Sequence, residues 1–165
     1  MSAARAVVRL LAAAAVLSGC RTERPAKPEQ LDPRACTPDP RASGPGLSPA
    51  AGTRLAGKVG RPFRAVLTYV APTEGTAGGD VTITGAELQV GGALPSGLLI
   101  TCGTDGCRIA PGERGCIVIA GTPTQAARVT IRVDTVLSAV RGSGGAGEAV
   151  PLPTVTAAYP LVVDR

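Results

Sequence analysis

The sequence predicts an all-β domain, an antiparallel β-sandwich of about seven to eight strands that spans residues 55–165. Apolar residues alternate with other residues along several segments, which is the period of half-buried strands. Turn signals rich in glycine and proline separate these segments. Beyond the N-terminal region no stretch shows a convincing helical period. About eight strands in roughly 110 residues are typical of a sandwich.

The strands are expected where the alternation is clearest. Phe63 opens the first of them, a long alternation runs from Val129 to Leu137, and another ends the chain from Val155 to Val163. Shorter apolar runs between turn signals complete the set. The expected strands cover residues 63–69, 81–84, 87–90, 98–102, 108–110, 116–120, 129–137 and 155–163.

The N-terminal residues 1–19 have the features of a secretory signal peptide. Two arginines, Arg5 and Arg9, precede an uninterrupted apolar run over residues 10–17, and small residues follow it. A charged segment, a short apolar segment and small residues before the cut are what such peptides share. The apolar run is too short to span a bilayer, which needs about 20 apolar residues. The sequence therefore predicts export.

The tetrad Leu17-Ser18-Gly19-Cys20 resembles the lipobox of bacterial lipoproteins. The resemblance implies a diacylglyceryl group on the Cys20 thiol, cleavage before Cys20 and acylation of the new amine. Two or three acyl chains give stable membrane anchoring, whereas one chain gives marginal binding. Arg21 follows the cysteine, and the absence of Asp there favours the outer membrane under the sorting rule of enteric bacteria. An ordinary signal peptide followed by a structural cysteine is the alternative.

Residues 20–54 are expected to form a disordered tether. They hold seven of the fifteen prolines and only two residues from the set Leu, Ile, Val and Phe, namely Leu31 and Leu47. Such a stretch cannot bury enough apolar surface to order itself, and its prolines favour extended chain. The domain boundary is therefore expected near Arg54.

The basic net charge of +5 is spread over the three regions. The net charge is +2 in residues 1–19, +2 in residues 20–54 and +1 in residues 55–165. A domain that binds nucleic acid gathers Lys and Arg on its folded part, because phosphate contacts need cations. The nearly neutral folded part argues against nucleic acid as a partner.

Three motifs in the domain resemble the Ig-like repeat of bacterial surface proteins, a cadherin-like sandwich. They are Val59-Gly60-Arg61-Pro62-Phe63, Leu94-Pro95-Ser96-Gly97-Leu98 and Ile119-Ala120-Gly121-Thr122-Pro123-Thr124. Gly97 and Gly121 are expected to adopt positive φ between strands, and Pro95 and Pro123 to end strands. The resemblance implies an adhesion or spacer module. The sequence departs from the family in the longer cysteine-bearing insertion at residues 101–115.

Cysteine counting supports both export and lipidation. Lipidation of Cys20 leaves four of the five cysteines, and four permit three pairings. We expect Cys102 to pair with Cys116 across neighbouring antiparallel strands, with Cys36 reaching Cys107. The alternative pairs Cys102 with Cys107 and Cys36 with Cys116. A metal or redox site is disfavoured because the spacings C-x4-C and C-x8-C differ from the C-x2-C pairs of such sites.

No catalytic constellation emerges from the sequence. The chain contains no His, so Ser96 in its glycine-flanked turn lacks a general base. The scattered acids Asp105, Glu113, Asp134 and Glu148 do not form a calcium loop. No cofactor is expected beyond the covalent lipid on Cys20, and no metal.

The expected function is that of a membrane-anchored, non-enzymatic lipoprotein of a bacterial cell envelope. Its single Ig-like module would serve a structural or protein-interaction role with an envelope or surface protein as partner. The alternative is a ligand-binding accessory module for surface polysaccharide or calcium.

Overall fold

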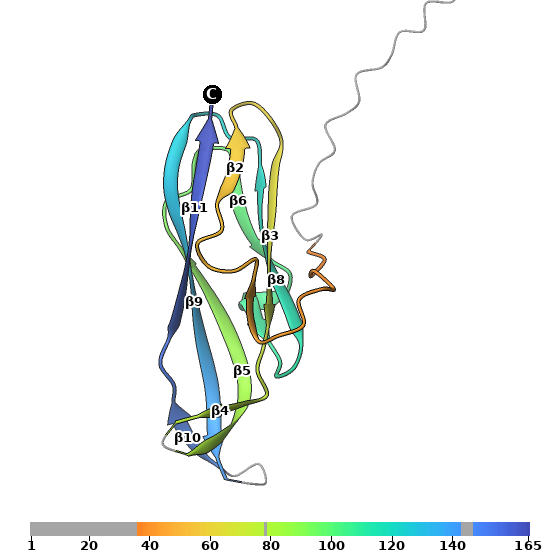
Figure 1. The fold of residues 1–165 in the computed structure, drawn as a ribbon, viewed down its shortest axis with the longest axis vertical. Coiled ribbons are helices and arrows are strands. Elements are labelled where there is room, and N and C mark those ends of the chain that lie inside the picture. The colour runs from red at the N-terminus through yellow and green to blue at the C-terminus, as the bar shows by residue number, and fades with distance from the viewer. Residues whose placement is uncertain (1–35, 78, 143–146) are drawn as a thin grey trace, which may run out of the picture. The chain divides into compact units, whose positions relative to one another are not determined.

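A computed structural model describes residues 36–77, 79–142 and 147–165, and these residues form a sandwich of two β-sheets (Figure 1). The expected lipidation site Cys20 and the signal peptide lie outside the described residues. Eleven strands and one turn of 3-10 helix are present in the described part of the chain, so the expected all-β class is confirmed. None of the described residues forms a helix with the length and hydropathy that a membrane crossing requires.

The first sheet has four strands in the order β1-β3-β8-β6. Its two central strands pair over their full lengths, from Phe63 opposite Gly121 to Val70 opposite Arg114. The apolar residues that alternate along these strands face the second sheet, as a period of two requires. The strands are β1 (Gly46–Ser48), β3 (Phe63–Val70), β8 (Arg114–Gly121) and β6 (Leu98–Cys102).

The second sheet is larger and has the order β2-β11-β9-β5-β4, with β10 also on β9 and β7 on β5. Its longest strand, β9, pairs with β5 on one side and with β11 on the other. β2 pairs with β11 in parallel. The strands are β2 (Leu55–Lys58), β4 (Glu74–Thr76), β5 (Asp80–Gly91), β7 (Arg108–Ile109), β9 (Ala127–Arg141), β10 (Glu148–Pro151) and β11 (Val155–Asp164).

The strand order identifies the sandwich as Ig-like. In an Ig domain the first, second, fifth and fourth strands form one sheet, and the third, sixth and seventh form the other. The sheet β1-β3-β8-β6 matches the first set, and the path β11-β9-β5 matches the second. The expected Ig-like fold is therefore confirmed from topology alone.

The core lies between the two sheets and is built from aliphatic side chains with few aromatic rings. Tyr159, the largest fully buried side chain, donates a hydrogen bond of 2.8 Å from its hydroxyl to the carbonyl oxygen of Pro49. A buried hydroxyl needs such a partner, because burying it unpaired is costly. The other large side chains with no exposed surface are Leu67, Ile117, Ile119, Ile131 and Leu161.

The structure merges two of the expected strands and adds four short ones. Residues 81–84 and 87–90 belong to one strand, β5, whose register shifts between Ile83 and Gly85. That bulge breaks the alternation without ending the strand. β1, β2, β4 and β10 span three or four residues each, which is too short for a periodic pattern.

The expected boundary of the sandwich at residue 55 is wrong, because described residues before it join the fold. Gly46, Leu47 and Ser48 pair with β3, and a cis Ser48–Pro49 peptide bond follows. Gly52 then donates a backbone hydrogen bond of 2.7 Å to the carbonyl oxygen of Ala158. These contacts use backbone groups, so the low apolar content of the segment did not reveal them.

The two glycine turns of the sequence motifs meet one another. Gly97 has φ +91° and Gly121 has φ +140°, so the expected positive φ is confirmed at both. A Cβ on Gly97 would overlap the carbonyl oxygen of Thr122, and one on Gly121 would overlap the carbonyl oxygen of Gly97. Thr124 donates a backbone hydrogen bond of 2.9 Å to the Ser96 carbonyl oxygen. Only glycine permits this close approach.

Replacement of either glycine should therefore destabilise the fold. We expect Gly97→Ala and Gly121→Ala each to lower the free energy of unfolding by about 2 kcal/mol or more, since strain and overlap act together. Gly91→Ala is the matched control, because a Cβ there meets no atom within 4 Å. Urea denaturation measures all three variants. Equal midpoints for Gly121→Ala and Gly91→Ala would contradict the proposed role of the turns.

Candidate functional site

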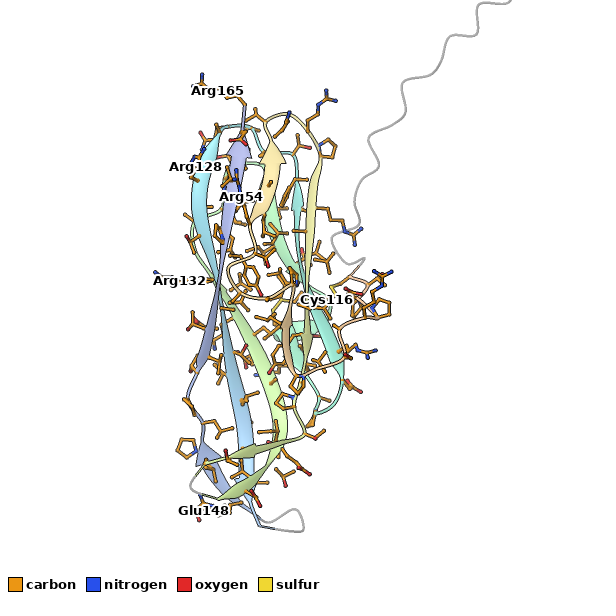
Figure 2. All side chains as sticks on the ribbon, viewed as in Figure 1. Arg54, Cys116, Arg128, Arg132, Glu148 and Arg165 are labelled. Carbon is orange, nitrogen blue, oxygen red and sulfur yellow. A yellow bond between two sulfur atoms is a disulfide. The ribbon has the colours of Figure 1, made fainter. Side chains whose placement is uncertain are left out.

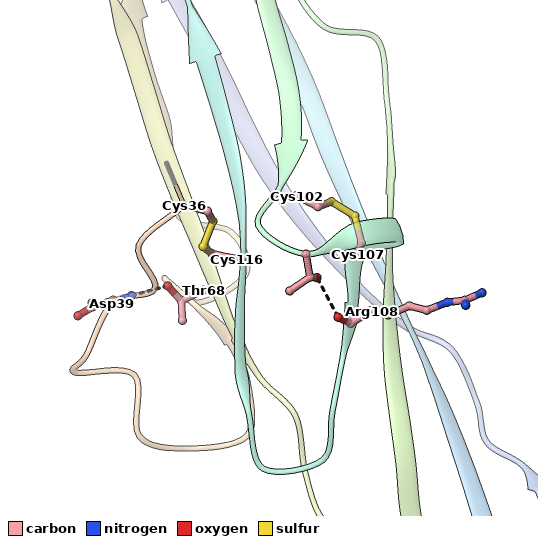
Figure 3. The surroundings of a disulfide bond; sticks show 8 residues. Cys36, Asp39, Thr68, Cys102, Cys107, Arg108 and Cys116 are labelled. Atoms are coloured by element: carbon pink, nitrogen blue, oxygen red, sulfur yellow. Dashed lines mark hydrogen bonds between the residues drawn. A yellow bond between two sulfur atoms is a disulfide. The ribbon is translucent and has the colours of Figure 1, made fainter. Parts of the chain in front are cut away.

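The four cysteines of the described residues form two disulfides. Cys36 is bonded to Cys116 with their Cα atoms 6.0 Å apart, and Cys102 to Cys107 with their Cα atoms 5.2 Å apart (Figure 3). The favoured pairing of Cys102 with Cys116 is therefore wrong, and the alternative pairing is confirmed. These cysteines act as structural crosslinks.

The register of β6 against β8 explains the correction. Cys102 lies opposite Ile117, so Cys116 is displaced from it by one residue. A displacement of one residue turns a side chain to the other face of the sheet. Ile117 is buried in the core, and Cys116 therefore faces outward, where Cys36 meets it. Cys102 bonds instead to Cys107 in the 3-10 turn Asp105–Cys107.

The segment from Cys36 to Ala42 covers part of the outer face of the first sheet. The amide N–H of Asp39 donates a 2.8 Å hydrogen bond to Oγ1 of Thr68, which lies directly opposite Cys116 and has no exposed surface. Nε of Arg114 donates a 2.9 Å bond to the carbonyl oxygen of Ala42. The disulfide and these hydrogen bonds hold residues 36–42 against the sandwich, although the sequence predicted that they belong to the tether.

The acids considered for calcium belong to separate elements of the fold. Asp105 belongs to the 3-10 turn, Glu113 precedes β8, Asp134 lies within β9 and Glu148 begins β10. Asp134 instead accepts a 2.5 Å hydrogen bond from the hydroxyl of Thr156. Over the described ranges there is no group of three or more His, Cys, Asp or Glu residues that could hold a metal ion.

An apolar groove of about 410 Å³ lies between β1 and the first half of β11. β2 pairs only with Leu161–Asp164, so the preceding part of β11 presents an edge on this side. Val155 on that edge is 59% exposed, and Tyr69 contributes to the lining. All the lining residues are uncharged: Pro45, Gly46, Leu47, Ala50, Ala51, Tyr69, Pro72, Thr135, Leu137, Val155, Thr156 and Ala157. The groove suits an uncharged, extended segment or a small apolar group.

Serine 96 lies in a turn beside the first glycine motif. Its carbonyl oxygen accepts hydrogen bonds from the amide and the hydroxyl of Thr124, so its backbone has a structural role. The sequence did not reveal the groove and left the choice between two disulfide pairings open, because both depend on which residues share a face of a sheet.

Comparison with solved structures shows a distant likeness to twelve chains. A solved structure of SSP-19, an MSP-domain protein like family member in Caenorhabditis elegans, is similar at 12% sequence identity and a TM-score of 0.43. The similarity covers 73% of this chain and 99% of that one. No family model and no curated protein matches the chain. The Ig-like assignment rests on the strand order described above.

The two disulfides should differ in their contribution to stability. The Cys36–Cys116 bond spans 80 residues of sequence and the Cys102–Cys107 bond spans 5. Loop-closure entropy predicts about 4.5 kcal/mol for the first and about 2 kcal/mol for the second. We expect Cys36→Ala with Cys116→Ala to lower the free energy of unfolding more than Cys102→Ala with Cys107→Ala. Denaturant unfolding of both double variants measures this, and the reverse order would contradict it.

The two tyrosines should titrate above their ordinary range. Burial raises the pKa of Tyr69 and the pKa of Tyr159 above the usual value of about 10. Because the native state holds these protons more tightly than the unfolded state, their stabilising contribution is complete below about pH 10 and is lost above it. Tyrosinate absorbance should show a midpoint above pH 10 that falls to about 10 in denaturant.

The chain has only these two tyrosines, so the assignment has a simple control. Tyr159→Phe should halve the absorbance change that the native protein shows above pH 10, because it removes one of the two tyrosines whose pKa is raised. A native midpoint at about pH 10 would show that burial does not act on these groups.

Proposed function

We propose that the chain is a lipid-anchored lipoprotein of a bacterial cell envelope that presents one Ig-like module for structural or protein-interaction roles. The lipobox-like tetrad at Cys20 is the observation that carries the proposal. The mature chain would begin at this cysteine and carry its acyl chains there, on the outer membrane. No enzymatic activity forms part of the proposal.

The disulfides support export. Disulfides form and persist in oxidising compartments such as the periplasm. Both bonds of the sandwich use cysteines other than Cys20. Cys20 is thus the one cysteine of the five that neither disulfide employs, as a thiol reserved for lipid should be.

The attachment of Cys36 to the sandwich sets the length of the spacer that would present the domain away from a membrane. The disulfide of Cys36 ties the chain to the sandwich, so only the residues between Cys20 and Cys36 act as the spacer. A chain of this length spans at most about 55 Å when fully extended. The proposed spacer is shorter than one that ends at residue 54.

The alternative function, an accessory module for surface polysaccharide or calcium, has less support. Ligand sites of this kind combine an apolar and aromatic lining with several placed polar groups. The residues that line the apolar groove include one aromatic ring, Tyr69, and no charged side chain. The acids that would bind calcium lie in separate elements.

Metabolic labelling with palmitate tests the anchor. We expect the wild-type chain, produced in a bacterium that processes lipoproteins, to incorporate label and to sediment with membranes. Cys20→Ala should abolish both, because only a thiol accepts the diacylglyceryl group.

Cys102→Ala with Cys107→Ala is the matched control, since it also removes thiols but leaves Cys20 in place. It should still be labelled and remain in the membrane fraction. Label on the Cys20→Ala chain would refute the proposed anchor.

A further inference from the structure

The outer face of the second sheet is divided into a basic half and an acidic half. The alternation along β9 places Ile131 and Val133 in the core and turns Arg128 and Arg132 to the outside, where both are exposed (Figure 2). Arg128 and Arg132 lie toward the end of the sandwich that holds the C-terminus. We call this end of the outer face the basic half.

Two further cations belong to the basic half. Lys58 lies opposite Asp164 in the pairing of β2 with β11, and exposed Arg54 directly precedes β2. Asp164 is the acid among them, and its Oδ1 lies 3.9 Å from an Arg128 nitrogen. Four cations against one acid leave this half strongly positive.

The acidic half lies further along the same strands. Asp134 is the next residue after Arg132 on the outer face of β9. Glu87 of β5 lies opposite Val136, the outer-face residue of β9 that comes after Asp134. Glu74 lies opposite Thr82, near the exposed Asp80 that begins β5. Two cations lie beside these four acids. Arg108 approaches Glu87 at 3.4 Å, and Arg141 donates a hydrogen bond to the carbonyl oxygen of Ala77, between β4 and β5. The outer face therefore changes sign along its length, although the domain as a whole is nearly neutral.

The dimensions of this face match those of a stable interface. The row of Val140 lies about 40 Å from Arg128, at the rise of a β-strand, and about three strands lie side by side along this length. At a spacing of about 4.8 Å they cover roughly 600 Å² on each copy. Two such faces give about 1,200 Å², the lower end of the range for stable interfaces. Small exposed residues, Thr130, Ala158 and Pro160, lie beside Arg128 and Arg132 within the basic half, and they allow another flat surface to approach.

A second copy of the chain has the surface that complements this face. A two-fold rotation exchanges the ends of the sheet, so the basic half of one copy meets the acidic half of the other, twice in one dimer. The cations lie toward β2 and the acids toward β4, so the strands of the two copies cross obliquely. Packed sheets adopt such angles, at roughly 30°.

We propose that the outer face of the second sheet is the contact surface of an antiparallel, two-fold symmetric dimer of this chain. Charge pairing between Arg128 and Arg132 on one copy and Glu74 and Asp80 on the other sets its orientation. The proposal goes beyond the proposed anchoring and does not depend on it. Because Leu31–Arg165 form one compact unit, residues 31–165 can be tested in solution.

Charge reversal provides the test. We expect residues 31–165 to sediment as a dimer in dilute buffer and to dissociate as the salt concentration rises, because salt screens exposed charges. Arg128→Glu with Arg132→Glu should weaken self-association at least about tenfold, and so should Glu74→Lys with Asp80→Lys. Arg41→Glu is the control, since Arg41 lies on the segment that covers the first sheet.

Mixing the two reversed variants gives the sharpest result. One variant then has two acidic halves and the other has two basic halves, so an equimolar mixture should form a heterodimer although neither variant dimerises alone. Circular dichroism checks that each variant is folded.

Three results would overturn the proposal. The first is a wild-type domain that stays monomeric at low salt up to millimolar concentration. The second is a dimer that both reversals leave unchanged. The third is a wild-type monomer that binds vesicles containing anionic phospholipid through Arg128 and Arg132, since the basic half would then serve a lipid surface.

Discussion

The register of β8 is the constraint on which much of the structure depends. Ile117 and Ile119 point into the core with no exposed surface, so Cys116 and Val118 must point outward. The outward position of Cys116 selects Cys36 as its partner and leaves Cys102 to bond with Cys107. A slip of one residue would exchange the core for the covered outer face, so hydrophobic burial and covalent pairing support the same register.

The fold could be predicted from the sequence because long alternations and glycine turns report directly on half-buried strands. The strand at Leu98–Cys102 was predicted at its observed bounds, and Gly97 and Gly121 adopt the expected conformation. β1, β2, β4 and β10 could not be predicted, since three or four residues show no period. The bulge between Ile83 and Gly85 hid the continuity of β5 for a related reason, because it interrupts the alternation within a strand that continues.

The site was harder to predict than the fold, because its features depend on which residues become neighbours across strands. The disulfide pairing needed the register of β6 against β8 to within one residue. The near-neutral charge of the folded part was correct as a sum, yet it concealed the separation of Arg128 and Arg132 from Glu74 and Asp80. The basic and acidic residues are not separated in this way along the sequence. The pairing of β2, β11, β9, β5 and β4 divides them into two halves of one face.

The Cys36–Cys116 bond also determines how the sandwich would respond to mechanical load. A pull on the chain from its N-terminal side enters through Cys36 and passes directly to β8, a central strand that is paired on both sides. The edge strand β1 lies inside the covalent loop, so such a force does not peel it from β3. Backbone between the two cysteines carries none of this load while the bond is intact. Tension from this side therefore acts first on β8, which leaves the sheet only when its hydrogen bonds to both neighbouring strands break.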